Sequence, residues 1–126
     1  MLPSDASDVH DLLCAAFEDE EPNFATWWAK RAGDPQFEPQ TVWLAHAIDR
    51  RLAGVAWFWS SGYLKDLAVA EFARRNGLAE AMLLNGIAHF SARNVGWMDL
   101  KTNKADNAAA YALYRKLGFF EVDWAG

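Results

Sequence analysis

The sequence predicts a single domain of the α/β (α+β) class, with a mixed, mostly antiparallel central sheet flanked by about four helices. Three strand-like runs follow one another between residues 41 and 69, which is typical of an antiparallel meander. A long helical pattern, a strand, a second helical pattern and a last strand-like run then alternate up to residue 124. A chain of 126 residues has room for one compact core, so we expect residues 1–126 to form one domain.

The N-terminal part predicts two helices before the first strand. Apolar residues recur at helical spacing from Val9 to Phe17, and a second pattern runs from Phe24 to Arg31. Pro22, a favourable first-turn residue, precedes the second pattern. An acidic run, residues 18–21, lies between the two predicted helices.

The remaining elements are predicted from alternation, helical stripes and caps. Strand patterns cover Thr41–Ile48, Leu52–Trp59 and Tyr63–Val69. Gly77 opens a long helix whose apolar stripe reaches Phe90, and a strand at Trp97–Thr102 follows it. A helix is expected over Ala108–Lys116, with Asn107 as N-cap and Gly118 as C-terminal cap, before a final strand over Phe119–Trp124.

Composition and charge disfavour several classes of protein. The net charge of -5 would repel phosphate backbones and anionic membrane surfaces, so we expect neither a nucleic-acid nor a membrane partner. The single cysteine, Cys14, cannot form an internal disulfide, and no Cys/His cluster has metal-ligand spacing. We therefore expect no metal and a reducing compartment. No basic leader is seen and no apolar run approaches the roughly 20 residues that span a bilayer, so we expect a cytoplasmic protein.

The chemistry is concentrated where the third strand meets the long helix. A loop that leads into a helix N-terminus presents unsatisfied N–H groups and a partial positive charge, which suit a phosphate. Two arginines add charge, and small residues let the backbone approach an anion closely. The loop and first turn comprise Arg74, Arg75, Asn76, Gly77, Leu78 and Ala79. On these six residues alone, an ordinary basic turn before a helix is an equally good reading.

A second motif makes the interpretation specific. The Arg-x-x-Gly-x-Ala pattern at 74–79 resembles the pyrophosphate loop of the GCN5-related N-acetyltransferase (GNAT) family. Downstream, the residues from Asn107 to Phe119, which include Leu113-Tyr114 and Leu117-Gly118-Phe119, are similar to the other signature of that family. The resemblance covers roughly residues 2–124 and implies a GNAT-like acyl-CoA N-acyltransferase fold. The usual first and last strands look shortened or absent.

The resemblance also implies roles for single residues. Leu67 and Val69 would offer backbone groups to the pantetheine arm and the thioester of acetyl-CoA, and residues 74–79 would hold its pyrophosphate. Asn107 would bind the pantetheine region as well as cap its helix. Tyr114 would protonate the departing thiolate of coenzyme A, the alternative being a core aromatic residue. The expected reaction is direct transfer of the acetyl group to an amine, with a backbone N–H near Val69 as the oxyanion donor.

The general base is the open part of this prediction. Some relatives carry a Glu on the strand before the Asn helix, but Thr102 or Lys101 stands there in this chain. Asp66 matches an acidic position of diamine-acetylating relatives and is our candidate, although a structural ion pair is an equally good interpretation. His46 and a water chain are further alternatives.

The acceptor is predicted only as a class. The acidic run 18–21 would suit a small, cationic amine, although a solvated loop explains it as well. The aromatic side chains of Trp27, Trp28, Trp57 and Trp59 could add cation–π contacts. Two alternatives are a noncatalytic acyl-CoA-binding module and an acetyltransferase that acts on proteins or peptides. Because the terminal strands look short, an uncovered sheet edge would favour a homodimer.

Overall fold

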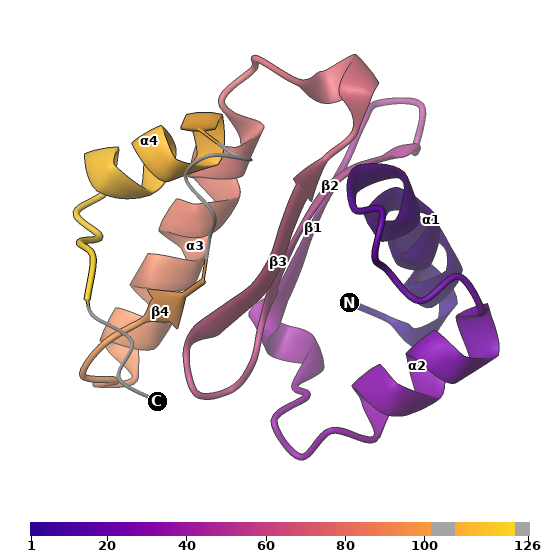
Figure 1. The fold of residues 1–126 in the computed structure, drawn as a ribbon, viewed down its shortest axis with the longest axis horizontal. Helices are drawn as coiled ribbons and strands as arrows, with labels where there is room; N and C mark the ends of the chain where they lie inside the picture. Colours follow the sequence, from indigo (N-terminus) through magenta and orange to yellow (C-terminus); the bar gives the residue numbers. More distant parts are fainter. Residues whose placement is uncertain (102–107, 123–126) are drawn as a thin grey trace.

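The computed structural model describes residues 1–101 and 108–122, which form a four-stranded sheet between two layers of helices (Figure 1). Helices α1 (Ala6–Ala16) and α2 (Phe24–Ala32) lie on one face of the sheet. Helices α3 (Leu78–Ala92) and α4 (Ala108–Lys116) lie on the other face. This arrangement agrees with the predicted α/β class and with the predicted number of helices.

The sheet is mixed and has the strand order β1-β2-β3-β4. Strands β1 (Val42–His46), β2 (Leu52–Phe58) and β3 (Tyr63–Val69) form the predicted antiparallel meander. Strand β4 (Asp99–Leu100) pairs in parallel with the first two residues of β3. Short 3-10 turns at Pro3–Asp5, Pro39–Thr41 and Glu71–Ala73 connect these elements.

Two of the predicted strands differ in the structure. The strand expected from Trp97 to Thr102 is only two residues long, and residues 119–122 of the expected final strand are not in a strand at all. The side chains of Phe120 and Val122 are 76% and 74% exposed, so they find no apolar layer to pack against. A strand needs a partner for its N–H and C=O groups, and the alternation of apolar residues alone does not provide one.

A β-bulge in β3 decides which side chains face which layer. Trp57 of β2 pairs with Asp66, but the next residue, Phe58, pairs with Leu64, so Lys65 is the extra residue. Leu64 and Leu67 therefore both point into the layer of α3, whereas Asp66 shares the opposite face with Trp57. Asp66 therefore lies on the face opposite Leu67 and Val69.

The two faces of the sheet bury separate apolar clusters. One cluster fills the space between the sheet and α1–α2 and is centred on Val9, Leu13, Trp27 and Trp57. The other joins the sheet to α3 and α4. It contains Phe58, Leu64, Met82, Leu83, Phe90 and Tyr114. Helix α3 approaches β2 closely at Gly86, where an added Cβ would lie 2.6 Å from a ring atom of Phe58. This close contact fixes the position of α3 on the sheet.

Candidate active site

The loop between β3 and α3 has the backbone geometry of an anion site. Gly77, at the N-cap of α3, has φ 72°, a left-handed conformation that glycine adopts without steric cost. The N–H of Ala81 donates to the Gly77 carbonyl at 3.0 Å, so the N–H groups of Leu78, Ala79 and Glu80 precede the first intrahelical donor. Three orphan donors and the positive end of the helix dipole therefore point out of the same helix end.

The side chains around this helix end fit a diphosphate group. Arg74 and Arg75 are exposed, and a Cβ built on Gly77 would meet no atom within 4 Å. The side chain of Asn76 instead donates to the Ala73 carbonyl at 3.4 Å and so supports the loop. The loop thus combines backbone donors, two cations and open space, a donor set that suits a diphosphate group.

Among the described residues, 1–101 and 108–122, no strand pairs with the edge of β3 that faces away from β2 beyond the short pairing with β4. Ala70 donates its N–H to the carbonyl of Ala53 in β2 at 2.8 Å, so by strand alternation Leu67 and Val69 direct their backbone groups to the opposite edge. The structure thereby brings together the two residues predicted for the pantetheine arm. The Val69 carbonyl accepts a bond from Arg74 Nε at 3.2 Å, which leaves the Val69 N–H as its available group.

Tyr114 lies in the same apolar cluster as Leu67, Val69 and Leu78. Its side chain is buried, with 8% exposure, and its ring packs edge-on against Phe119 at a centroid distance of 6.0 Å. Burial raises the pKa of the Tyr114 hydroxyl to about 12, so the phenol keeps its proton at neutral pH. A protonated hydroxyl in this cluster is able to donate a proton or a hydrogen bond.

Tyr111, one turn earlier on α4, has a different environment. Its hydroxyl donates to Glu121 Oε1 at 2.9 Å, which ties α4 to the segment that follows it. This contact gives Tyr111 a structural role. Asn107, the other residue predicted for this region, lies outside the described residues.

On the other face of β3, Asp66 lines a cavity of about 240 Å³. The other residues that line it are Phe17, Asp19, Glu20 and Lys65. This cavity joins the end of α1, the acidic run and the middle of β3. The acidic run predicted for the acceptor region and the predicted base candidate are therefore neighbours in space.

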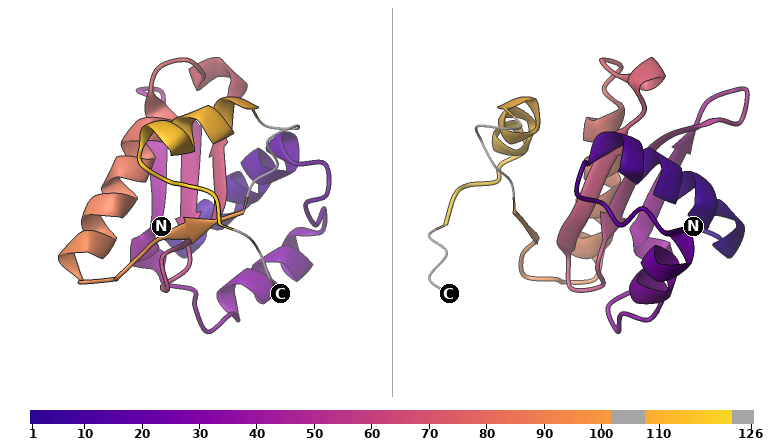
Figure 2. Two further views of the ribbon diagram at one scale, coloured as in Figure 1. Left: turned by 60° about the vertical axis from the view of Figure 1, so that its left-hand side comes forward. Right: turned by 45° about the vertical axis from the view of Figure 1, so that its right-hand side comes forward.

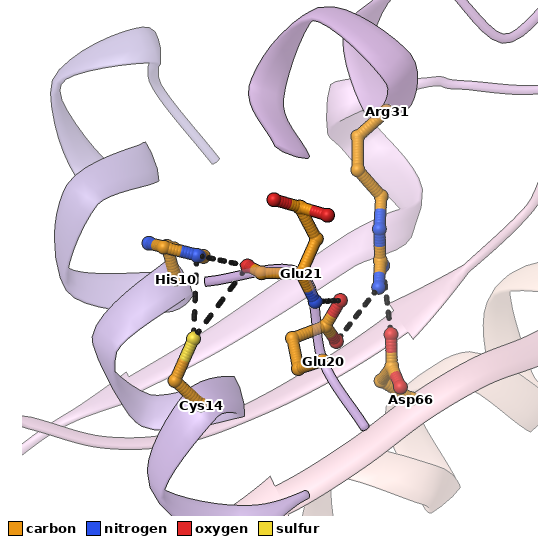
Figure 3. A network of polar contacts seen from close by, with 6 residues as sticks. All are labelled: His10, Cys14, Glu20, Glu21, Arg31 and Asp66. Atoms are coloured by element: carbon orange, nitrogen blue, oxygen red, sulfur yellow. Dashed lines mark hydrogen bonds and ion pairs between the residues drawn. The ribbon is translucent and has the colours of Figure 1, made fainter. Parts of the chain in front are cut away.

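Arg31 of α2, a residue that the sequence pattern did not single out, binds both acids (Figure 3). Its Nη1 lies 2.7 Å from Asp66 Oδ2 and its Nη2 lies 3.3 Å from Glu20 Oε2. The first pair is close but is not aligned as a hydrogen bond, so we treat it as a mainly Coulombic contact. Burial raises the pKa of the Asp66 carboxyl, while the Arg31 guanidinium opposes that rise.

The same guanidinium packs between two indole rings. Its Cζ lies 5.4 Å from the ring centroid of Trp27 and 4.8 Å from that of Trp57, and Arg31 is 6% exposed. Two of the tryptophans expected to bind a cationic acceptor therefore bind a cation of the chain itself. The spacing of four residues between Trp27 and Arg31 on one helix is the sequence signal that could have revealed this contact.

A second set of contacts anchors the acidic run from α1. His10 Nε2 lies 2.7 Å from the Glu21 carbonyl oxygen and 3.3 Å from Cys14 Sγ (Figure 3). Burial and the neighbouring carboxylates, chiefly Glu20, raise the pKa of the Cys14 thiol, which makes it a poor nucleophile at neutral pH. The acidic run is thus held from both sides, by His10 through its backbone and by Arg31 through Glu20.

The other proposed proton relay, His46, lies elsewhere. It is exposed at the end of β1, which pairs with β2 and not with β3. Among the described residues, no group of three His, Cys, Asp or Glu side chains gathers as a metal site. Within the same part of the chain, every helix is too short or too polar to cross a membrane.

Known proteins agree with this geometry. Residues 6–119 match the Acetyltransferase (GNAT) family. The mycothiol acetyltransferase of Clavibacter michiganensis subsp. michiganensis is 37% identical over 92 residues, which cover 71% of this chain and 30% of that protein. The mycothiol acetyltransferase of Mycolicibacterium gilvum is 33% identical over 130 aligned residues, which cover 93% of this chain and 43% of that protein. The chain therefore spans less than half the length of these curated relatives.

Solved structures share the fold. The ribosomal-protein-S18-alanine N-acetyltransferase from Escherichia coli superposes with a TM-score of 0.75 at 24% identity, covering 98% of this chain and 76% of that one. An aminoglycoside acetyltransferase from an uncultured soil sample superposes with a TM-score of 0.68 at 21% identity, covering 100% and 92% of the two chains. The chain belongs to the GNAT family of acetyltransferases. The predicted family and its fold are thereby confirmed.

Proposed function

We propose that this chain uses acetyl-CoA to acetylate a primary amine of a small, cationic acceptor. The observation that supports the proposal is that three features share one side of the sheet. The loop 74–79 leads from β3 into α3, Leu67 and Val69 lie on β3, and Tyr114 packs in the same apolar cluster as these two residues and Leu78. Together they supply donors for a diphosphate, a backbone edge for an extended amide chain, and a protonated phenol.

Each part of the chain has a stated task in this proposal. The N–H groups of residues 78–80 and the side chains of Arg74 and Arg75 would hold the pyrophosphate. Bound acetyl-CoA would supply the activated acetyl group. Tyr114 holds a proton on its hydroxyl at neutral pH, which makes it the group available to protonate a leaving thiolate. Because a buried phenol is protonated over the whole assay range, its role is that of an acid and not of a base.

The acceptor would enter from the α1–α2 side, through the cavity beside Asp66. Three carboxylates line or adjoin this cavity, those of Asp19, Glu20 and Asp66, and they face the cations of Lys65 and Arg31. One negative charge remains when all five groups are ionised, which favours an acceptor with a single ammonium group in the cavity. Asp66 is the candidate to take the proton from that ammonium, since it is the most buried of these acids and lines the cavity.

The ion pair between Asp66 and Arg31 also favours a second candidate function. A carboxylate engaged by a guanidinium is a weaker base, so a noncatalytic acyl-CoA-binding module would keep the loop 74–79 and lack turnover. The two candidates differ in one measurable respect, because only the enzyme releases free thiol from acetyl-CoA when an amine is added.

The test is an acceptor panel with thiol detection. The protein is mixed with acetyl-CoA and with polyamines, amino acids, aminoglycosides, short peptides or a mycothiol-type amine, and free thiol is followed. We expect amine-dependent release that falls about 10²–10⁴-fold in Tyr114→Phe, the usual range for loss of a general acid. Tyr111→Phe is the matched control and keeps its activity. Tight binding of acetyl-CoA without release by any amine would support the binding module instead, and acetylation of peptides alone would assign protein substrates.

The assembly and cellular location belong to the same proposal. Trp97, Phe120 and Val122 are exposed, and among the described residues β4 pairs with β3 alone; exposed apolar side chains and an uncovered strand suit a second copy of the chain. Analytical ultracentrifugation at micromolar concentration should show a dimer that Phe120→Glu disrupts; a monomer at every concentration would contradict it. The free thiol of Cys14 fits a cytoplasmic location, which cell fractionation would test.

A further inference from the structure

Arg31 carries one positive charge and contacts two carboxylates. One guanidinium lies between two carboxylates, those of Asp66 and Glu20, whose side chains are 11% and 13% exposed. The guanidinium is itself almost fully buried, and the indole rings of Trp27 and Trp57 enclose it. A buried cation without a partner is unfavourable, because desolvation penalises the charged form and arginine does not lose its proton. Arg31 therefore requires at least one ionised partner at all times.

The groups that face Asp66 come from several elements. Arg31 reaches it from α2, and Asp19 and Glu20 border the same cavity from the acidic run. Lys65 and Tyr63 are its neighbours on β3, and Asp99 of β4 acts on Tyr63. Strand β2 contributes the uncharged Trp57 as the cross-strand partner, and α1 ends at the uncharged Phe17. Among these described groups, Arg31 is the buried cation, and Glu20 is its second anionic partner beside Asp66.

Proton uptake by Asp66 changes this balance. With Asp66 as the only partner, neutralisation of its carboxylate would leave the buried guanidinium unpaired, which would oppose the uptake of the proton. Glu20, at 3.3 Å, keeps the guanidinium paired when Asp66 becomes neutral. Two carboxylates on one arginine therefore lower the electrostatic cost of protonating either of them.

We propose that Arg31 is a positioning residue whose second partner, Glu20, enables Asp66 to accept a proton from the acceptor amine. The proposal rests on the proposed function, in which Asp66 is the base. In this step, the N–H bond of the acceptor ammonium breaks and an O–H bond forms on Asp66, so the amine becomes neutral and the carboxylate becomes a carboxylic acid. No oxidant or reductant takes part. The ion pair between Arg31 and Glu20 persists throughout the step.

The proposal predicts opposite effects for two substitutions. In Glu20→Gln, the whole charge of Arg31 acts on Asp66 and the repulsion from Glu20 is lost, so ionised Asp66 is favoured and its titration moves to lower pH. The acid limb of kcat/KM should move in the same direction, and kcat should fall because a weaker base accepts a proton less readily. In Arg31→Met the titration should move to higher pH, and Arg31→Lys, which keeps the charge, should restore part of the difference.

The test measures the Asp66 titration directly and in turnover. The ¹³C shift of the Asp66 carboxyl is followed against pH by NMR in the full chain, and the pH profile of kcat/KM is recorded for each variant that circular dichroism shows to be folded. Glu18→Gln is the matched control, because it removes a charge from the same acidic run without touching Arg31, and it should leave the NMR titration unchanged.

The possible results separate the two proposals. Parallel downward shifts of the NMR and kinetic titrations in Glu20→Gln support the role of Arg31 and Glu20. Turnover with an unmoved or upward titration in Glu20→Gln overturns that role and leaves the acetyltransferase function standing. A downward NMR shift in a protein that releases no thiol with any amine overturns the proposed function instead.

Discussion

The close approach of α3 to β2 makes a strong prediction for Gly86→Ala. The ideal Cβ of this residue would lie 2.6 Å from Cε2 and 2.7 Å from Cζ of Phe58. The ring of Phe58 is 1% exposed and is held by Trp43 and Phe90, at centroid distances of 5.7 and 5.5 Å. It has little space to move away, so the extra methyl group should overpack the core, at a cost of about 1–3 kcal/mol.

Helix propensity acts in the opposite direction. Alanine is favoured over glycine inside a helix by about 1 kcal/mol, so we expect Gly86→Ala to lower the free energy of unfolding by about 1 kcal/mol net. Urea denaturation measures this change as a lower midpoint with an unchanged slope. Asn85→Ala, one residue earlier on the exposed side of α3, is the control and should raise the free energy of unfolding by about 0.5 kcal/mol.

A double-mutant cycle identifies the cause. In a Phe58→Leu background the ring is absent, so Gly86→Ala should become neutral or stabilising, with a coupling of about 1 kcal/mol or more between the two positions. A Gly86→Ala protein that is as stable as the parent, or a cost that persists without the Phe58 ring, would refute the packing argument.

Three further predictions concern the backbone, a buried hydroxyl and the thiol. Gly77→Ala should cost about 1 kcal/mol because of its positive φ, whereas Gly96→Ala, which is equally open but lacks a positive φ, should change thermal stability little; equal effects would contradict this. Thr41→Val should cost about 1–3 kcal/mol in urea, because the buried Oγ1 donates to a carbonyl at 2.7 Å that would lose its partner. Burial, Glu20 and Asp11 raise the pKa of the Cys14 thiol, so iodoacetamide at pH 8 should alkylate it more slowly than a free thiol and faster in Asp11→Asn; no acceleration in that variant would argue against the charge effect.

The local elements of this fold are largely predictable from the sequence. Strand β3 and helix α4 have the predicted bounds. The apolar run of β3, and the apolar stripe of α4 with Gly118 after it, are patterns of neighbouring residues that the sequence contains directly. Strand β4 and residues 119–122 are not predicted correctly. Their state depends on backbone partners from distant parts of the chain, which local alternation does not contain.

The candidate site shows the same division. The proposed anion-binding loop lies within six consecutive residues, so its position can be predicted directly from the sequence. The ion pair between Arg31 and Asp66 joins α2 to β3. An ion pair is among the interpretations of Asp66 from the sequence, but the sequence does not identify the cation that would form it. Only the packing of α2 against the Trp57 face of the sheet selects Arg31 rather than Lys30 or Arg51 as that partner.

The bulge at Lys65 has a consequence for how this strand tolerates change in length. In a strand with strict alternation, residues an even number of positions apart share a face, so Leu64 and Asp66 would point to the same side of the sheet. Because Lys65 is an extra residue in the pairing with β2, Leu64 and Asp66 instead point to opposite faces. Deleting Lys65 would make Leu64 and Asp66 adjacent in a regular strand, opposite Phe58 and Trp57, and each side chain would stay on its present face. The bulge can therefore be removed without moving Asp66 into the α3 layer, whereas deleting a residue on either side of it would reverse the faces of the residues beyond.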